Sequence, residues 1–497
     1  MDFDRQSGLF LHIASLPGPD GIGTLGDPAK TFVDFLADSG QSLWQFCPLG
    51  PTIPIHDNSP YQSYSAFAGN PLFIDLDELV ERGWLEDLDR PDFDDGTVEY
   101  EPVREYKEAR LEDAFETFKA DGSDDDQAAF EAFTDDAGDW LDEYALYRAL
   151  RTHFDGVSWL DWPEGPKMRD PEALAEYRAE LSETIEYRKF LQWVFDEQWS
   201  QLQAYANERG VGLVGDMPIY VDLDSADVWA NPEIFKLDEQ REPKYVSGVP
   251  PDEFSEDGQM WGTPVYDWAA LAERDYEWWV SRFERLLQRV DIFRIDHFKG
   301  FESYWEIPAD ADTAREGEWV DGPHEDIFYA VRDELGELPI VVEDLGEITD
   351  EMDRIREDLE YPGMNVAAFT DWCDGDSRYH PSSYDENSVA YTSTHDTDTV
   401  AGWYADLDEQ QTDCLHYAVD YEGGDVHWDI LDTIWGSDSV ITLAQVQDPL
   451  GYGSDARFNV PGTVEDNWAW RVGEDALDED VAERLYEITE SSGRLTD

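Results

Sequence analysis

Short apolar runs recur along the chain, and each of them ends in polar residues. Near-continuous apolar runs are typical of parallel strands, because helices cover both faces of a parallel sheet. Segments with helical periodicity separate most of these runs. The pattern predicts eight strands, within residues 8–19, 42–51, 211–221, 291–297, 339–346, 365–369, 388–396 and 440–448.

Eight strands that alternate with helices predict an α/β fold, a (β/α)8 TIM barrel whose site lies at the carboxyl ends of the strands. No internal repeat or low-complexity linker divides the sequence, so we expect residues 1–497 to form a single catalytic barrel domain. Residues 75–208 are acidic and mostly helical, and we expect an insertion together with a returning barrel helix that runs from 170 to 210. Residues 222–290 form the second predicted insertion.

The charge of the sequence is strongly unbalanced, with 116 acidic residues against 34 basic ones and a net charge of -82. A hydrophobic content of 41%, with 20 Trp, 24 Tyr and 24 Phe, is enough for a large core, so the acidic excess does not indicate disorder. Self-repulsion on this scale destabilises a compact chain unless salt screens it. The composition is similar to that of halophilic cytoplasmic proteins, and we expect neither nucleic acid nor membrane as a partner.

The three cysteines, Cys47, Cys373 and Cys414, are far apart and have no metal-ligand spacing. We therefore expect three reduced thiols in a reducing cytosol. The N-terminal residues lack the basic segment and apolar run of a signal peptide, and no apolar stretch reaches about 18 residues. These features predict a soluble, cytoplasmic protein.

The candidate chemistry begins in residues 291–300, DIFRIDHFKG. Arg294 and Asp296 are two positions apart in a strand pattern, so their side chains share one face. A neighbouring guanidinium favours the ionised form of a carboxylate, which suits Asp296 as a nucleophile. An ion pair that only sets strand register has the same pattern, so this segment alone leaves both interpretations open.

Three further carboxylates, Asp216, Glu343 and Asp396, fall near the ends of other predicted strands. Converging carboxylates suit either a metal site or glycoside cleavage. The metal interpretation lacks a recognised ligand spacing, although His297 and His395 adjoin two of the acids. Glycoside cleavage requires one ionised carboxylate and one proton donor. Glu343 follows four apolar residues, and an apolar approach raises a carboxyl pKa, so it suits the proton donor.

Eight motifs occur in order between residues 8 and 471: GLFLHIASLPGPDGIGTLG, NSPYQSYSAFAGNP, VGDMPIYV, GVPPDEFSEDGQMWGTPVY, FRIDHFKGFESYWEIP, VVEDLG, STHDTDT and NVPGTVEDNWAWR. Together they resemble the amylomaltase, or 4-α-glucanotransferase, family, which is glycoside hydrolase family 77. The resemblance implies a barrel of the α-amylase superfamily with inserted, largely helical subdomains and no C-terminal β-domain. We expect no cofactor and no bound metal.

The resemblance also implies roles for the carboxylates: Asp296 as the nucleophile, Glu343 as the acid/base and Asp396 as the stabiliser of the transition state. Further residues match positions that contact the sugar or hold the carboxylates, namely Arg294, His395, Asp216 and Asn467.

Three segments are expected to line the glucan site. Tyr61 matches a tyrosine of the donor side, and Ser59 in the same loop is a further sugar-binding candidate, although such a loop also fits a packed lid. Residues 248–255, which include Asp252, resemble a mobile loop over the site and lie in the second insertion. Trp261 matches an aromatic residue of the acceptor side, and core packing is its alternative role.

The activity that the resemblance implies is transfer of a 1,4-α-glucan segment from a maltodextrin to the 4-hydroxyl of glucose or another maltodextrin, with retention. The expected partners are α-1,4-glucans, maltooligosaccharides and glucose. An α-glucan hydrolase, a debranching-type transferase, an inactive glucan-binding protein and a calcium-binding structural role remain as alternatives. Residues 51–58, PTIPIHDN, differ from the shorter glycine-and-tyrosine turn of many relatives, which leaves open a remote glucan-binding groove near that turn.

Overall fold

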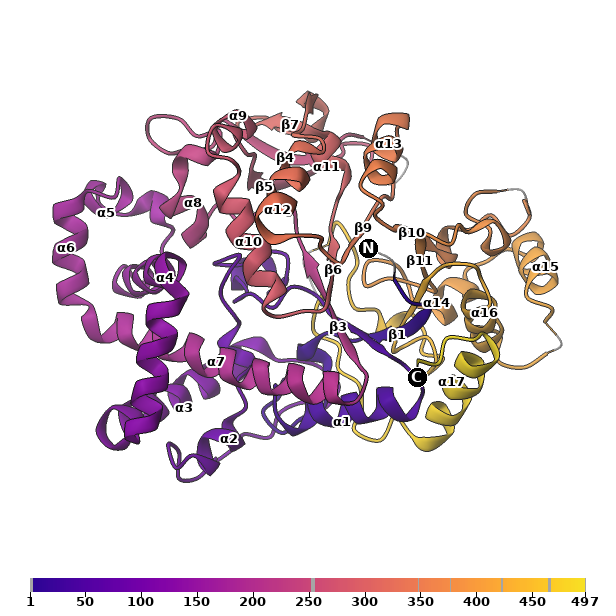
Figure 1. Cartoon of the computed structure of the whole chain (residues 1–497), viewed down its shortest axis with the longest axis horizontal. Helices are drawn as coiled ribbons and strands as arrows, with labels where there is room; N and C mark the ends of the chain where they lie inside the picture. Colours follow the sequence, from indigo (N-terminus) through magenta and orange to yellow (C-terminus); the bar gives the residue numbers. More distant parts are fainter. Residues whose placement is uncertain are drawn as a thin grey trace.

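The computed structural model describes residues 3–251, 255–346, 348–375, 377–421, 423–463 and 466–496. Eight parallel strands form its centre in the order β10-β11-β12-β1-β2-β3-β6-β9 (Figure 1). The backbone N–H of Val342 in β9 donates to the carbonyl of Pro362, directly before β10, at 2.9 Å, so the two edges meet in a nearly closed (β/α)8 barrel. The strands are β1 (Gln6–Phe10), β2 (Leu43–Gln45), β3 (Gly212–Met217), β6 (Ile292–Ile295), β9 (Ile340–Val342), β10 (Gly363–Val366), β11 (Ser388–Tyr391) and β12 (Ile441–Gln445).

The barrel strands are apolar on both faces, and this explains their near-continuous apolar runs. One face of the strands packs inside the barrel, where Leu43, Val214 and Ile292 lie together with other buried residues. The alternate residues of the strands belong to the larger core that the helices cover. All eight predicted strands are present, although β10 begins two residues early and Ala367–Phe369 is a 3-10 turn where the prediction extended the strand.

Helices surround the barrel, and α1, α7 and α16 pack directly on strands β2, β3 and β12 (Figure 1). None of the helices in the described parts of the chain is both long and apolar enough to cross a membrane. The helices are α1 (Asp27–Asp38), α2 (Leu76–Glu81), α3 (Tyr100–Asp121), α4 (Asp124–His153), α5 (Glu164–Lys167), α6 (Pro171–Glu180), α7 (Ser182–Glu208), α8 (Ala226–Ala230), α9 (Trp268–Ala272), α10 (Glu277–Leu287), α11 (Lys299–Glu302), α12 (Asp326–Leu335), α13 (Asp350–Asp358), α14 (Val400–Ala405), α15 (Glu409–Ala418), α16 (Val426–Trp435) and α17 (Glu479–Ser491).

The stretch between β2 and β3 is mostly helical, with α2 to α7 drawn in indigo to magenta on one side of Figure 1. The single helix predicted over 170–210 is wrong in one respect, because the chain breaks at Leu181 into α6 and α7. Leu181 is the cap between them, with a ψ of 17°, and nothing in its apolar periodicity indicates this break. Helix α4 is also interrupted, at Gly138, whose φ of 61° suits a residue without a Cβ.

A second, four-stranded antiparallel sheet lies beside the barrel, in the order β5-β4-β7-β8. The prediction missed it, because glycine and proline interrupt the alternation of its short strands. Its strands are β4 (Tyr245–Val249), β5 (Gln259–Pro264), β7 (Ser303–Pro308) and β8 (Glu318–Asp321).

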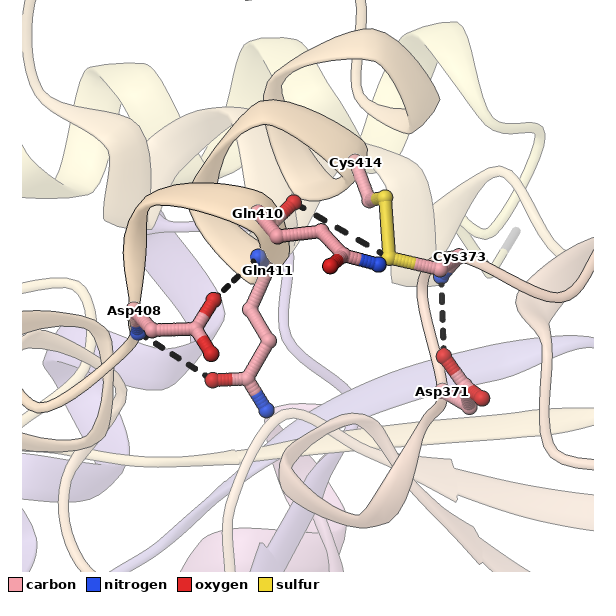
Figure 2. Close-up of a disulfide and its surroundings, with 6 residues drawn as sticks. All are labelled: Asp371, Cys373, Asp408, Gln410, Gln411 and Cys414. Atoms are coloured by element: carbon pink, nitrogen blue, oxygen red, sulfur yellow. Dashed lines mark hydrogen bonds between the residues drawn. A yellow bond between two sulfur atoms is a disulfide. The ribbon is translucent and has the colours of Figure 1, made fainter.

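The prediction of three reduced thiols is wrong. Cys373 and Cys414 form a disulfide, with their Cα atoms 5.0 Å apart, and Cys47 is free and buried (Figure 2). Cys373 lies in the connection between β10 and β11, and Cys414 lies in α15, so the two are 41 residues apart along the chain. The fold brings them together, and a disulfide depends on that spatial separation and not on spacing in the sequence.

Candidate active site

Arg294 lies at the centre of a group of carboxylates at the carboxyl ends of β3, β6 and β9. The register of β3 and β6 places Asp216 opposite Arg294, whose Nη1 donates to both carboxylate oxygens of Asp216 at 2.8 and 2.6 Å. The same Nη1 donates to Asp296 Oδ1 at 3.0 Å. The other arm, Nη2, lies 3.2 Å from Glu343 Oε2. One buried guanidinium therefore holds three carboxylates together.

The backbone turns sharply after Asp296. His297 has a φ of 52°, in the left-handed region that a side chain with a Cβ rarely adopts. Its N–H donates to Glu343 Oε2 at 2.6 Å, so the strained turn supplies a fixed donor to this carboxylate. Burial lowers the pKa of the His297 imidazole to about 4, so the ring is neutral at pH 7.

A chain of hydrogen bonds links Asp216 to Asp396 through two rings. The hydroxyl of Tyr61 donates to Asp216 Oδ2 at 2.7 Å and lies 2.8 Å from His395 Nε2. Because the Tyr61 hydroxyl donates its only proton to Asp216, the Tyr61 oxygen accepts from the His395 Nε2–H. His395 Nε2 is also 3.2 Å from Asp396 Oδ2. Burial lowers the pKa of His395, but Asp396 and Asp216 together raise it, so the net shift is upward.

Asn459 and Arg457 hold Asp396 and were not among the predicted site residues. Asn459 Nδ2 donates to Asp396 Oδ1 at 2.6 Å. Arg457 donates from Nη2 to the backbone carbonyl of Asp396 and from Nε to that of Asn459, both at 2.8 Å. These contacts fix both the carboxylate and its backbone.

Asn467, which was expected to contact the sugar or hold the carboxylates, lines the cleft and also uses its amide within its own loop. Its Oδ1 accepts from the N–H of Val460 at 2.9 Å, and its Nδ2 donates to the carbonyl and hydroxyl oxygens of Thr463 at 3.2 and 3.1 Å. Asn459 and Asn467 belong to the same sequence motif, and only the fold shows which of the two amides reaches the carboxylate.

The carboxylates differ in their pKa. Burial raises the pKa of Asp296 to about 6, while Arg294 lowers it and Glu343 and Asp396 raise it further. The ion pair with Arg294 therefore offsets the effect of burial only in part, and a carboxyl with a pKa of about 6 is mainly ionised at pH 7. Desolvation raises the pKa of Asp396, but His395 and Asn459 outweigh it and bring the pKa to about 2.

A cleft of about 440 Å³ opens above these groups, within the size range of small-molecule sites. Its lining includes the predicted site residues Asp296, Glu343, Asp396, Tyr61, Ser59, Trp261 and Asn467. Asp216, Arg294 and His395 are each 4% exposed and lie behind this lining. The Trp261 ring meets His297 edge to face, with ring centroids 5.0 Å apart. Asp252 lies outside the described residues.

A barrel with carboxylates gathered at the carboxyl ends of its strands, beneath a cleft with an aromatic wall, is the arrangement of a sugar-processing enzyme. Within the described ranges, no group of three His, Cys, Asp or Glu side chains is arranged to hold a metal ion.

Comparison with known proteins identifies the family to which the chain belongs. Residues 11–476 match the sequence model of glycoside hydrolase family 77, described as 4-alpha-glucanotransferase. The 4-alpha-glucanotransferase of Streptococcus pneumoniae is 44% identical over 99% of this chain and 98% of its own, and that of Thermus thermophilus is 42% identical over 100% of both. The amylomaltase of Streptococcus agalactiae, solved in complex with acarbose, superposes with a TM-score of 0.96 at 38% identity and covers 99% of this chain and 100% of its own. The chain belongs to the 4-alpha-glucanotransferase family and is a glycosyl-transferring enzyme.

Proposed function

We propose that this enzyme moves a 1,4-α-glucan segment from a donor maltodextrin to the 4-hydroxyl of glucose or another maltodextrin by a retaining double displacement, with Asp296 as nucleophile and Glu343 as acid/base. The observation that carries the assignment is that the two arms of Arg294 contact these two carboxylates at 3.0 and 3.2 Å. A shared guanidinium keeps the carboxyl groups close, which favours the separation of about 5 Å in retaining enzymes over the wider gap of inverting ones.

In the first step, an Asp296 oxygen attacks the anomeric carbon as the glycosidic bond breaks. Glu343 gives its proton to the departing 4-oxygen, and the covalent glycosyl-enzyme forms. With a pKa of about 6, Asp296 is mostly ionised at neutral pH and available as a nucleophile. In the second step, Glu343 takes the proton from the 4-hydroxyl of the acceptor, whose oxygen displaces Asp296 and restores the original configuration.

Asp396 is the proposed stabiliser of the transition state. Its pKa of about 2 keeps it negative, as suits a group that hydrogen-bonds sugar hydroxyls near a developing positive charge. The proposed function of Arg294, Asp216, Tyr61 and His395 is to hold the carboxylates and the sugar at the cleavage point. The hydrogen bonds that join these side chains support this role.

Transfer competes with hydrolysis at the covalent intermediate. An acceptor sugar that occupies the cleft excludes water from the intermediate. Trp261, which lines the cleft with its ring, is the proposed acceptor platform, because sugar faces pack on aromatic rings. Ser59 and Asn467 are proposed sugar contacts on the cleft wall. Asp252 is a further proposed sugar contact, from the loop of residues 248–255 that is proposed to cover the site.

Incubation with maltotriose alone tests the proposal. Each bond broken in transfer is remade on another acceptor, so glucose and a ladder of longer maltodextrins should appear while total reducing ends stay nearly constant. The measurement is product chromatography together with a reducing-end assay in concentrated KCl. Reducing ends that rise in step with glucose would show a hydrolase instead.

The proposed setting is the salt-rich cytoplasm of a halophile. The excess of 116 acidic over 34 basic residues supports it, because such a charge needs strong screening. The proposed partners are α-1,4-glucans, maltooligosaccharides and glucose.

A further inference from the structure

A second cavity, of about 80 Å³, lies behind the active-site wall, between α10 and the carboxyl ends of β2 and β3. Tyr61 and Asp216, which belong to the hydrogen-bond network of the active site, also line this cavity. The cavity therefore adjoins the inner wall of the active site. Since one water needs about 10–15 Å³ of such space, the cavity has room for several water-sized species.

Three arginines line this cavity from the same side. Arg282, Arg285 and Arg289 follow one another at helical spacing on α10 and just beyond its end. They are only 4%, 8% and 7% exposed. In a chain with 34 basic residues against 116 acidic ones, three buried guanidiniums in one place need a specific explanation.

The carboxylates that face these arginines do not balance them. Asp196 contacts Arg285 through a bidentate pair and lies 3.4 Å from Arg289. Asp227 faces Arg282, and burial raises the pKa of its carboxyl to about 6. The Arg282 guanidinium itself donates to two backbone carbonyls, those of Pro218 at 2.5 Å and Ile219 at 3.2 Å.

The other two acids on the cavity wall have basic partners, although Arg294 also contacts Asp296 and Glu343. Asp216 is paired with Arg294 at 2.6 Å, and Asp222 with His56 at 3.1 Å. The three guanidiniums of this side thus have two carboxylates, Asp196 and Asp227, next to them.

Arg289 is the least satisfied of the three. A guanidinium has five N–H donors, but within the described part of the chain the Arg289 side chain has one acceptor, Asp196 at 3.4 Å. Its Nε is buried without a hydrogen-bond partner. Burial, together with the neighbouring Arg285, lowers the pKa of Arg289 to about 9, although Asp196 raises it. Buried donors of this kind are normally paired.

We propose that the cavity is a binding site for a monovalent anion of halide size, chloride in a KCl-rich medium, held by the Arg289 guanidinium. The buried Arg289 Nε without a partner and the single acceptor at 3.4 Å leave donors that one small anion would satisfy. The remaining wall contributes apolar side chains such as Leu49, Ala68 and Val290, which offer no further charged donors to a larger polyanion. The bound anion would tie α10 to the wall behind Tyr61 and so stabilise the site without taking part in the reaction.

Crystallography of the wild-type enzyme tests the site directly. In crystals grown or soaked in KBr, we expect an anomalous bromide peak in the cavity at hydrogen-bond distance from Arg289. Bromide peaks confined to the protein surface, with only water in the cavity, would overturn the proposal.

Thermal unfolding gives an independent test. At constant potassium concentration, glutamate is replaced stepwise by chloride, and the Tm of the wild type, of Arg289→Gln and of a control variant is measured. The control is Arg274→Gln, which removes an exposed arginine paired with Glu233. The wild type and the control should show a saturable rise in Tm of a few degrees, as mass action requires for one site, and Arg289→Gln should not. Equal chloride responses in all three proteins would contradict the proposal. If Arg289→Gln fails to fold, the bromide experiment on the wild type decides.

Discussion

Arg294 distinguishes this site from an ordinary ion pair, because it contacts Asp216, Asp296 and Glu343 at once. Its planar fork serves separate partners on its two arms, which a lysine ammonium does not reproduce. Asp216 receives two of its hydrogen bonds and is the structural partner. Arg294 makes one contact with each of the other two carboxylates, which remain on the cleft wall, where a substrate reaches them.

Substitution of the two cleft carboxylates should separate their proposed roles. Asp296→Asn should abolish turnover because the nucleophile is lost. Glu343→Gln should lower kcat/KM on maltotriose by about 10²–10⁴-fold, but much less on a glucosyl fluoride, whose leaving group needs no protonation. Steady-state kinetics with both donors measures this, and unchanged melting curves serve as the control. Near-normal rates for Asp296→Asn would contradict the assignment.

The pH dependence should report the ionisation of Asp296. Burial raises the pKa of its carboxyl to about 6, and the nucleophile must be ionised, so kcat/KM should fall as the pH drops below about 6. The charge of Arg294 lowers this pKa, so Arg294→Gln, which removes the charge, should move the acidic limb to higher pH as well as reduce the rate. A pH–rate profile that stays flat to pH 5 would show that Asp296 does not limit the reaction in this way.

Asn459 should matter through its hydrogen bond to Asp396. A hydrogen bond to a charged group contributes about 1.5–3 kcal/mol, so Asn459→Ala should lower kcat/KM by about 10- to 100-fold. Asn459→Asp should be worse, because it sets a second carboxylate against Asp396. Asn467→Ala removes an amide that braces its own loop and lines the cleft, so it should lower Tm as well as kcat/KM. Kinetics of Asn459→Ala close to those of the wild type would remove Asn459 from the site.

At the scale of elements, the barrel strands were predictable because burial on both faces leaves a plain apolar signal. The four carboxylates could be identified because each follows such a run. Contacts between distant segments were not predictable: the pairing of Asp216 with Arg294 depends on strand register, and that of Asn459 with Asp396 on the path of a loop. The second sheet escaped prediction because its short strands contain glycine and proline.

The disulfide between Cys373 and Cys414 should stabilise the connection from β10 to β11 without affecting catalysis. It closes a loop of 41 residues, and its loss should lower the free energy of unfolding by about 2–4 kcal/mol. Cys373→Ser, Cys414→Ser and the reduced wild type should therefore melt at the same, lower temperature and keep their kcat. Denaturation with and without reductant measures this. Identical stability of the oxidised and reduced wild type would show that the bridge contributes nothing.

At the scale of the whole molecule, charge is the dominant feature. With 34 basic residues against 116 acidic ones, most carboxylates have no cation to pair with. Several of the cations are buried at functional or structural points, among them Arg294, Arg289 and Arg494. Among the described residues, buried carboxylates are as numerous as buried cations, so the acidic excess stays on the surface, and folding must work against its repulsion.

The fold should therefore depend on salt. At about 1 M salt the Debye length is only about 3 Å, so repulsion between carboxylates is largely screened, and in dilute buffer it is not. We expect unfolding and loss of activity on dialysis into dilute buffer, and a Tm that rises with KCl and levels off near molar concentrations. Potassium glutamate should produce most of this rise in Tm, because screening depends on ionic strength and not on the kind of anion. Only the smaller, chloride-specific part of the rise should disappear in Arg289→Gln. A Tm that is independent of ionic strength would show that the acidic surface does not control stability.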